Sequence, residues 1–307
     1  MKKIIIGAGG GYDIVVAAML RNRLLHGASV EIDLGGFLNP KFVHFFSNDD
    51  FVDDITDEQA INKSLDVIRF RRLPCNTHDT PINRYQHYKK YGEIKDIVDS
   101  RVRKSVGCPV YNFSLRFSMD SIVQFLNDNY AEIIVCDVGG DILFSGQRDN
   151  MIKTPIIDAF ALAIARRYAV KKSAFIYLLG LGIDGELYKK NIEMNLSELD
   201  YKKAILSIEY LDQTDVDFLK QFYNQVKFEE NSGKTNRLLI DIWENNIDKN
   251  DIAKKRNIHD MEQWFNKIFI VEANKLASMN PLSAVDNYND MLNMLQEFGV
   301  SCEGYMI

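Results

Sequence analysis

Short apolar runs alternate with stretches of helical periodicity at the start of this chain. Lys2–Ile6 is a run rich in β-branched residues, and Ile14–Leu25 carries apolar residues at the three- and four-residue spacing of a helix. Ser29–Leu34 then alternates as a second strand does, after a break at Gly27. The first 35 residues therefore predict a β-α-β unit.

The same alternation returns after residue 117. A helix is predicted from Ser118, a strand at Ile133–Val138, a helix from Thr154 to Ala169, and a strand at Ala174–Leu181. Continuous apolar strands that alternate with amphipathic helices are typical of a parallel sheet covered on both faces. The predicted fold class is therefore α/β, with a Rossmann-like, doubly wound, mostly parallel sheet and a helical insertion.

Residues 36–117 and 189–260 interrupt this regular pattern. The first segment predicts strands at Leu65–Leu73 and around Val110–Phe113. The second is predicted to be all-helical, with helices at Tyr201–Leu211, Asp215–Val226 and Thr235–Asn245. A strand at Ile268–Val271 and a helix at Asn287–Phe298 then return to the sheet. The predicted division is a Rossmann-like α/β core at 1–188, a helical insertion or cap at 189–260, and a C-terminal return to the core at 261–307.

Composition narrows the function classes. The net charge of −6 and the sequence pI of about 5.5 weigh against a general nucleic-acid binder, which usually has a basic domain. The four cysteines are scattered, without metal-ligand spacing. The chain opens directly into a predicted strand, and its apolar runs fall short of the roughly 20 residues of a membrane helix. We expect a cytoplasmic protein with no membrane partner.

The first candidate site is the glycine loop that follows the first strand. Its sequence is Gly-Ala-Gly-Gly-Gly-Tyr-Asp, from Gly7 to Asp13. Clustered glycines allow backbone N–H groups to approach a ligand, and the helix that follows favours an anion. The predicted ligand-binding residues here are Gly7, Gly9, Gly10, Gly11 and Asp13. An acid at a phosphate-binding turn repels an anion, so Asp13 is expected to cap the helix, hold a metal or bind a hydroxyl.

Asp33 extends the first motif. It lies about 20 residues beyond the glycines, at the predicted end of the second strand, which is where dinucleotide-binding folds place the acid that binds ribose. Tyr12 occupies the position of the third glycine of that pattern. The glycine loop of this chain is also not a Walker loop. Asp33 is a candidate ligand-binding residue on this basis.

Two further motifs combine glycines with acids after predicted strands. Asp137-Val-Gly-Gly-Asp141 can place two carboxylates on one Mg²⁺ or on sugar hydroxyls, and either carboxyl could act as a general acid or base. Gly180–Glu186 repeats the same chemistry. The predicted catalytic residues are Asp137, Asp141, Asp184 and Glu186, with Asp137 and Asp141 as metal ligands. Ligand binding is predicted for Gly139, Gly140, Arg148, Gly182 and Gly185.

These motifs resemble those of an uncharacterised family of archaeal and bacterial proteins, known only as a domain of unknown function. The resemblance rests on the Gly7–Asp13 loop, on Asp137–Asp141, on Thr154-Pro155 with Asp158, and on Asp184-Gly-Glu-Leu187. The stretch Trp264–Pro281, which leads into Asn280-Pro281-Leu282, is similar to the family's C-terminal signature, whereas Ser301–Ile307 departs from its ending. The resemblance implies shared motifs and a shared fold, but no reaction.

Three functions remain open on the sequence. The first is an enzyme that binds a nucleotide or another phosphorylated small molecule, with Mg-dependent hydrolysis or group transfer. The second is a binder of a dinucleotide or S-adenosyl cofactor. The third is a non-catalytic ligand sensor or assembly subunit, for which a homo-oligomer would be natural. Paired acids and glycine loops serve enzymes and binding proteins alike, so the sequence does not choose between them.

Overall fold

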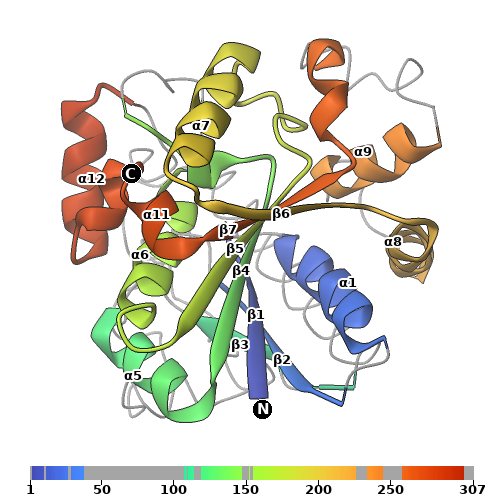
Figure 1. Cartoon of the computed structure of the whole chain (residues 1–307), viewed down its shortest axis with the longest axis horizontal. Coiled ribbons are helices and arrows are strands. Elements are labelled where there is room, and N and C mark those ends of the chain that lie inside the picture. The colour runs from blue at the N-terminus through green and yellow to red at the C-terminus, as the bar shows by residue number, and fades with distance from the viewer. Residues whose placement is uncertain are drawn as a thin grey trace, which may run out of the picture.

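A computed structural model describes most of the chain (Figure 1). The described residues are 2–9, 12–26, 29–37, 107–108, 110–113, 119–146, 152, 155–225, 234–244 and 258–300. The predicted strand at Leu65–Leu73 lies outside them.

One seven-stranded sheet forms the centre of the described structure, in the order β3-β2-β1-β4-β5-β7-β6. β7 is antiparallel to both of its neighbours, and the other six strands run in one direction. The strands are β1 (Lys2–Gly7), β2 (Glu31–Phe37), β3 (Val110–Phe113), β4 (Glu132–Val138), β5 (Ser173–Leu179), β6 (Ile205–Tyr210) and β7 (Lys267–Glu272). The prediction of an α/β fold with a mostly parallel sheet is confirmed.

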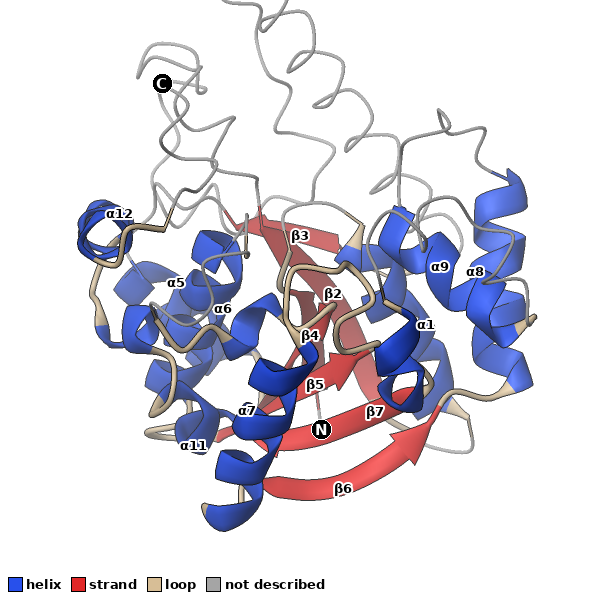
Figure 2. Cartoon of the chain, turned by 90° about the horizontal axis from the view of Figure 1, so that it is seen from above, coloured by secondary structure: helices blue, strands red, loops and turns tan. Residues whose placement is uncertain are grey.

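Helices cover both faces of this sheet (Figure 2). On one side lie α1 (Asp13–Leu25), α8 (Gln213–Gln225) and α9 (Lys234–Trp243). On the other side lie α5 (Met119–Asn129), α6 (Pro155–Tyr168), α7 (Lys189–Tyr201), α11 (Ala273–Ala277) and α12 (Tyr288–Glu297). Three 3₁₀ turns, η2 (Asp141–Leu143), η5 (His259–Trp264) and η6 (Pro281–Ala284), join these elements.

The apolar runs of the sequence become the core because the central strands are covered on both faces. Ile4, Ile5 and Ile6 of β1 are all fully buried, although alternate residues point to opposite faces of the sheet. The helix α6 is also apolar almost all round, with every residue from Pro155 to Ala165 buried. One carboxylate, that of Asp158, lies within this apolar stretch.

Two details of the predicted secondary structure were wrong. Residues 201–211 were predicted as helix, but β6 occupies Ile205–Tyr210 and pairs with β7. Apolar residues at 205, 208 and 211 fit a helical spacing, yet the segment is an edge strand with one exposed face. The second strand also continues past Leu34 to Phe37, because Gly35 and Gly36 pair with Ile6 and Gly7 of β1.

Within the described part of the chain, no helix is both long enough and apolar enough to cross a bilayer.

Candidate functional site

The order in which successive strands are added to the sheet reverses between β1 and β4, although the two strands are parallel. From β1 the chain moves outward to β2 and β3, and it then returns to place β4 on the other side of β1. In open α/β sheets, a crevice forms at the carboxyl ends of the strands at such a switch point, and ligands bind there. Gly7, at the end of β1, pairs with Cys136 of β4, so the residues that follow these two strands meet at this crevice.

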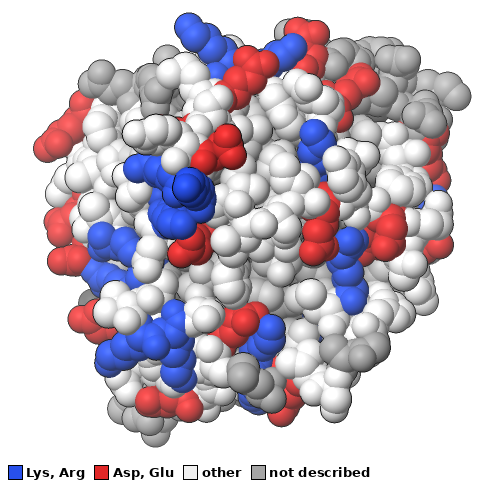
Figure 3. Space-filling view, in the orientation of Figure 1, with Lys and Arg blue, Asp and Glu red and all other residues white. Residues whose placement is uncertain are grey.

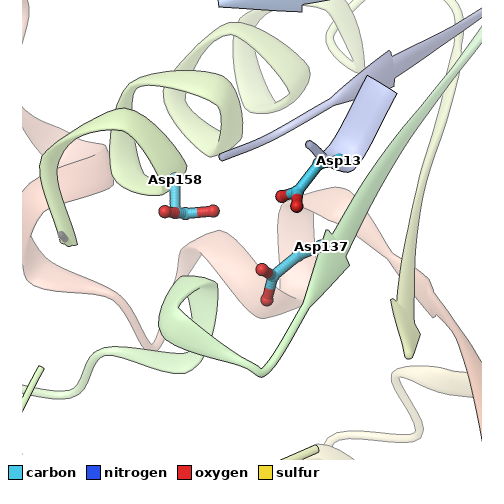
Figure 4. Close-up of side chains that lie close together, drawn as sticks. All are labelled: Asp13, Asp137 and Asp158. Carbon is cyan, nitrogen blue, oxygen red and sulfur yellow. The ribbon is translucent and has the colours of Figure 1, made fainter. Parts of the chain in front are cut away.

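Three aspartates converge at the switch point (Figure 4). Asp13 begins α1, Asp137 is the penultimate residue of β4, and Asp158 lies in the first turn of α6. One carboxylate oxygen from each lies within 4.8 Å of the other two. Asp137 and Asp158 are 2% exposed, so both carboxyls are shielded from water.

The glycine loop after β1 positions the first of these carboxylates. The N–H of Gly9 donates to Asp13 Oδ2 at 2.7 Å, and a Cβ on Gly9 would lie only 2.5 Å from that oxygen. On the other side of the loop, Asn236 of α9 donates to the carbonyl of Tyr12 at 3.0 Å. The Gly9 N–H is thus already used by Asp13, which limits the predicted role of this loop as an anion cradle.

The burial of Asp137 and Asp158 has an electrostatic consequence. Burial, together with the negative charges of Asp13 and Asp184, raises the pKa of Asp137 well above its usual range. Burial and the charges of Asp137 and Asp13 raise the pKa of Asp158 in the same direction. No lysine or arginine among the described residues pairs with either carboxyl. A proton on one of the two carboxyls, or a cation between them, would relieve this repulsion.

Asp158 offers a buried oxygen toward the other acids. Among the described residues, no N–H or O–H group donates a hydrogen bond to its Oδ1. The charges of Asp137 and Asp158 also repel one another, which favours a proton on one of the two carboxyls. A buried carboxylate without donors is costly unless a proton or a cation satisfies it. A proton would satisfy this oxygen, and so would a cation.

Three more acids extend the negative cluster. Asp141 follows the two glycines after β4, and Asp184 and Glu186 lie in the loop after β5. Burial and the charges of Asp184 and Glu186 raise the pKa of Asp141 well above its usual range. The predicted catalytic residues Asp137, Asp141, Asp184 and Glu186 are thus close enough to influence one another.

A close backbone contact joins the loops after β4 and β5. The N–H of Gly182 donates to the carbonyl of Gly139 at 2.6 Å, and the N–H of Gly139 donates to the carbonyl of Leu179 at 3.1 Å. This contact brings Asp184 against Gly139, where a Cβ would lie 2.0 Å from Asp184 Oδ2. Gly139 also has a φ of +116°, a conformation that other residues rarely adopt. Glycine is therefore required at this position on two counts.

Two buried asparagines fix the turn that carries Asp141. Asn195 of α7 donates to the carbonyl of Leu143, and Asn280 donates to the carbonyl of Ile142, each at 3.1 Å. Asn280 also caps η6 by accepting from the N–H of Leu282 at 3.0 Å. The Asn280-Pro281-Leu282 stretch therefore supports the site from the C-terminal part of the chain.

Not every predicted site residue joins this cluster. Asp33 lies in the first half of β2, opposite Ile4, where its carboxylate contacts Lys2 Nζ at 2.9 Å and accepts from the Tyr130 hydroxyl at 2.8 Å. The strand continues to Phe37, so Asp33 is not at the carboxyl end where ribose would bind. Gly7 ends β1, and Gly9, Gly140, Gly182 and Gly185 lie in the loops of the crevice, whereas Gly10, Gly11 and Arg148 are outside the described residues.

Asp158 was not among the predicted site residues. It lies in a helix, well beyond the strand-end motifs, and the packing of α6 under β4 brings it to Asp137. Its signal in the sequence is a single acid in the run Pro155–Ala165, in which every other residue is apolar. An acid at such a buried position needs a partner inside the protein that offsets the loss of water around its carboxyl group.

The fold and the site define an α/β protein with a buried acidic triad at the switch point of its sheet. The chain belongs to the family described as "Protein of unknown function (DUF1152)", whose model matches residues 81–301. This match includes Asp137, Asp158 and Asn280, and it begins after the glycine loop that carries Asp13. No curated protein and no solved structure matches the chain.

Proposed function

We propose that this protein is an enzyme that binds a divalent cation, Mg²⁺ or Mn²⁺, through Asp13, Asp137 and Asp158 and acts on a nucleotide or another phosphorylated small molecule. The observation that carries the proposal is the convergence of three carboxylate oxygens within 4.8 Å of one another at the switch point of the sheet. A reaction of hydrolysis or group transfer at phosphorus suits this arrangement.

The spacing of the triad fits a small hard cation. Mg²⁺ holds oxygen ligands at about 2.1 Å, so two ligands of one ion lie about 3–4 Å apart. The triad oxygens need only small side-chain movements to reach that spacing. Asp137 and Asp158 have no basic partner among the described residues, and a cation would offset the repulsion within the triad.

A bound cation would also supply the positive charge that the glycine loop lacks. Asp13 already accepts the N–H of Gly9 and brings a negative charge to the start of α1, which disfavours a bare phosphate at that position. A divalent ion on the triad would reverse the sign of the local charge and attract phosphoryl oxygens. Mg²⁺ usually keeps several waters and open positions for a phosphorylated substrate.

The remaining acids are suited to proton transfer. Asp141, Asp184 and Glu186 lie beyond the triad, in loops after β4 and β5. A carboxyl whose pKa is raised by burial and by neighbouring acids, as that of Asp141 is, is suited to hold or accept a proton. In this proposal the triad binds the ion, and one acid of the second group activates the attacking water or hydroxyl.

A second candidate is a dinucleotide or S-adenosyl cofactor bound without a metal. It is favoured by the strand order 3-2-1-4-5, because Rossmann folds with this order bind dinucleotides at the same switch point. The contacts of Asp33 with Lys2 and Tyr130 weigh against it, since they engage the carboxylate that would bind ribose.

Thermal unfolding against a panel of ligands separates these candidates. Nucleotides, sugar phosphates, dinucleotides and S-adenosyl compounds are each added with Mg²⁺ and with EDTA. A ligand at about 100 times its dissociation constant adds ~2.7 kcal/mol of stability. We expect a phosphorylated compound to stabilise the protein only with Mg²⁺, and we expect Asp184→Asn to reduce its turnover more than its binding.

Other outcomes of the panel are equally informative. Stabilisation by a dinucleotide or S-adenosyl compound in EDTA would favour the second candidate. Metal-dependent binding with no turnover would favour a sensor. A panel with no response in either condition would count against the proposed substrate class.

A further inference from the structure

The outer edge of the described sheet carries an exposed apolar strip. Leu206, Ile208 and Tyr210 of β6 are 52%, 44% and 54% exposed. Ile208 and Tyr210 alternate along the regular part of the strand, so their side chains lie on one face, whereas Leu206 lies at a bulge, where the pairing with β7 shifts between Ile205 and Ser207. The one charged residue of the strand, Glu209, points to the other face and pairs with Arg23 of α1 at 3.0 Å. Exposed edge strands usually carry charges, proline or a bulge that prevents pairing; here the bulge is confined to the start of β6, and Ile208 and Tyr210 lie beyond it without a charge or a proline between them on this face.

The backbone of β6 is also available for pairing. The N–H of Leu211 donates to the carbonyl of Asn266, just before β7, at 2.8 Å. Because successive residues of a strand point their backbone groups to alternate sides, Glu209 and Ser207 also point toward β7. Ile208, between them, directs its N–H and C=O toward the open edge.

We propose that β6 joins two copies of this chain, paired antiparallel about a two-fold axis at Ile208. In this register each Ile208 donates its N–H to the carbonyl of the other Ile208, and Tyr210 lies toward the bulge at Leu206 of the second copy. Ile208 and Tyr210 of each copy then meet the apolar strip of the other on the same face. The proposal does not depend on the proposed function.

The charges at the two ends of β6 favour a second copy of this chain as the partner that pairs with this edge. Lys203, just before the strand, and Asp212, just after it, are both exposed. Arg23 faces three acids at the end of the strand, Glu209, Asp212 and Asp215, so that end keeps a negative charge. Antiparallel pairing brings Lys203 of each copy near Asp212 of the other.

The space-filling view agrees with this distribution (Figure 3). In the orientation of Figure 1, the surface along the middle of β6 is uncharged. Basic side chains gather on the side where the strand begins, and acidic side chains lie toward its end. A surface that is apolar at its centre and opposite in charge at its two ends is complementary to itself under a two-fold rotation.

The oligomeric state in solution tests this interface. We expect the full chain to sediment as a dimer, and we expect Ile208→Lys to weaken the dimer at least 100-fold because it places two like charges at the two-fold axis. Val170→Lys is the matched control: Val170 is 79% exposed and lies in the turn after α6, away from β6. This control variant should remain a dimer, and both variants should keep the circular dichroism of the parent.

A cross-link tests the register. In an antiparallel hydrogen-bonded pair the two Cα atoms are about 5.5 Å apart, within the range of a disulfide. Ile208→Cys should therefore form a disulfide-linked dimer on oxidation. Tyr210→Cys alone should not, because the two copies of this residue would be about 14 Å apart. A monomeric parent chain, or a dimer that Ile208→Lys leaves intact, would overturn the proposal.

Discussion

Asp158→Asn should make the metal-free protein more stable at neutral pH and abolish its response to Mn²⁺ or Mg²⁺. The side chains have the same shape, and the amide of asparagine supplies permanently the donor that the Asp137–Asp158 pair otherwise obtains from a proton. The substitution leaves the cluster with one group fewer that must take up a proton on folding. It also removes a metal ligand, so we expect at least a 100-fold loss of cation affinity.

The pH dependence of this gain has a definite sign. The pKa of Asp158 is raised in the folded protein, whereas an unfolded aspartate titrates near 3.9. Between these two pKa values the folded state binds more protons than the unfolded state, so the free energy of unfolding falls as pH rises, by up to about 1.4 kcal/mol per pH unit for one proton. The advantage of Asp158→Asn should therefore be small near pH 4 and grow toward neutral pH.

Denaturant unfolding in EDTA, from pH 5 to pH 8, measures this advantage. Asp128→Asn is the matched control, because Asp128 is an exposed carboxylate on α5 that contacts only Gln124 of its own helix in the described structure. The control should change neither the pH dependence nor the effect of Mn²⁺. An Asp158→Asn variant that is less stable than the parent throughout, with its Mn²⁺ response intact, would contradict our description of the triad.

Gly139→Ala should damage both the fold and the site. The φ of +116° and the 2.0 Å approach of Asp184 Oδ2 to a Cβ each oppose a side chain at this position. Backbone strain and steric overlap each cost about 1–3 kcal/mol, so we expect a loss of several kcal/mol in the free energy of unfolding. Asp184 would also be displaced, which should reduce turnover.

Two further variants separate the two causes. Gly299 has a φ of +67° but no atom within 4 Å of a Cβ, so Gly299→Ala measures backbone strain alone. The double variant Gly139→Ala with Asp184→Ala removes the overlapping carboxylate, and it should recover part of the stability lost in Gly139→Ala. If the two substitutions are additive in denaturant unfolding, the contact between Gly139 and Asp184 is not the cause of the loss.

The central sheet could be predicted because its strands are covered on both faces. Such strands are continuous apolar runs, as at Ile133–Val138, and the helices between them have a clear period. Prediction from the apolar pattern failed at Ile205–Tyr210. An edge strand with an exposed apolar face can have the same spacing of apolar residues as an amphipathic helix. Sequence spacing does not distinguish the two when the partner strand comes some 60 residues later.

The candidate site was predicted only in part, for a similar reason. Asp137 lies at the end of β4, and Asp141 and Asp184 lie in the loops after β4 and β5, so the rule for strand ends located them. Asp158 comes from a helix and reaches the site by tertiary packing, which no local pattern shows. Asp33 matched a spacing rule, but its strand continues for four more residues, to Phe37, and its carboxylate forms an ion pair with Lys2. The place of an acid within its strand was thus a better guide to the site than its distance along the sequence from the glycine loop.

The most direct test of the central claim is a calorimetric titration of the metal-free protein with Mn²⁺. It should be done in two buffers of different ionisation enthalpy, because the cation must displace the proton held by the buried acids. We predict one ion bound per chain, with release of protons, and neither signal in Asp158→Asn. No binding of Mn²⁺ or Mg²⁺ at millimolar concentration, or binding that Asp158→Asn leaves unchanged, would contradict a metal site at this triad.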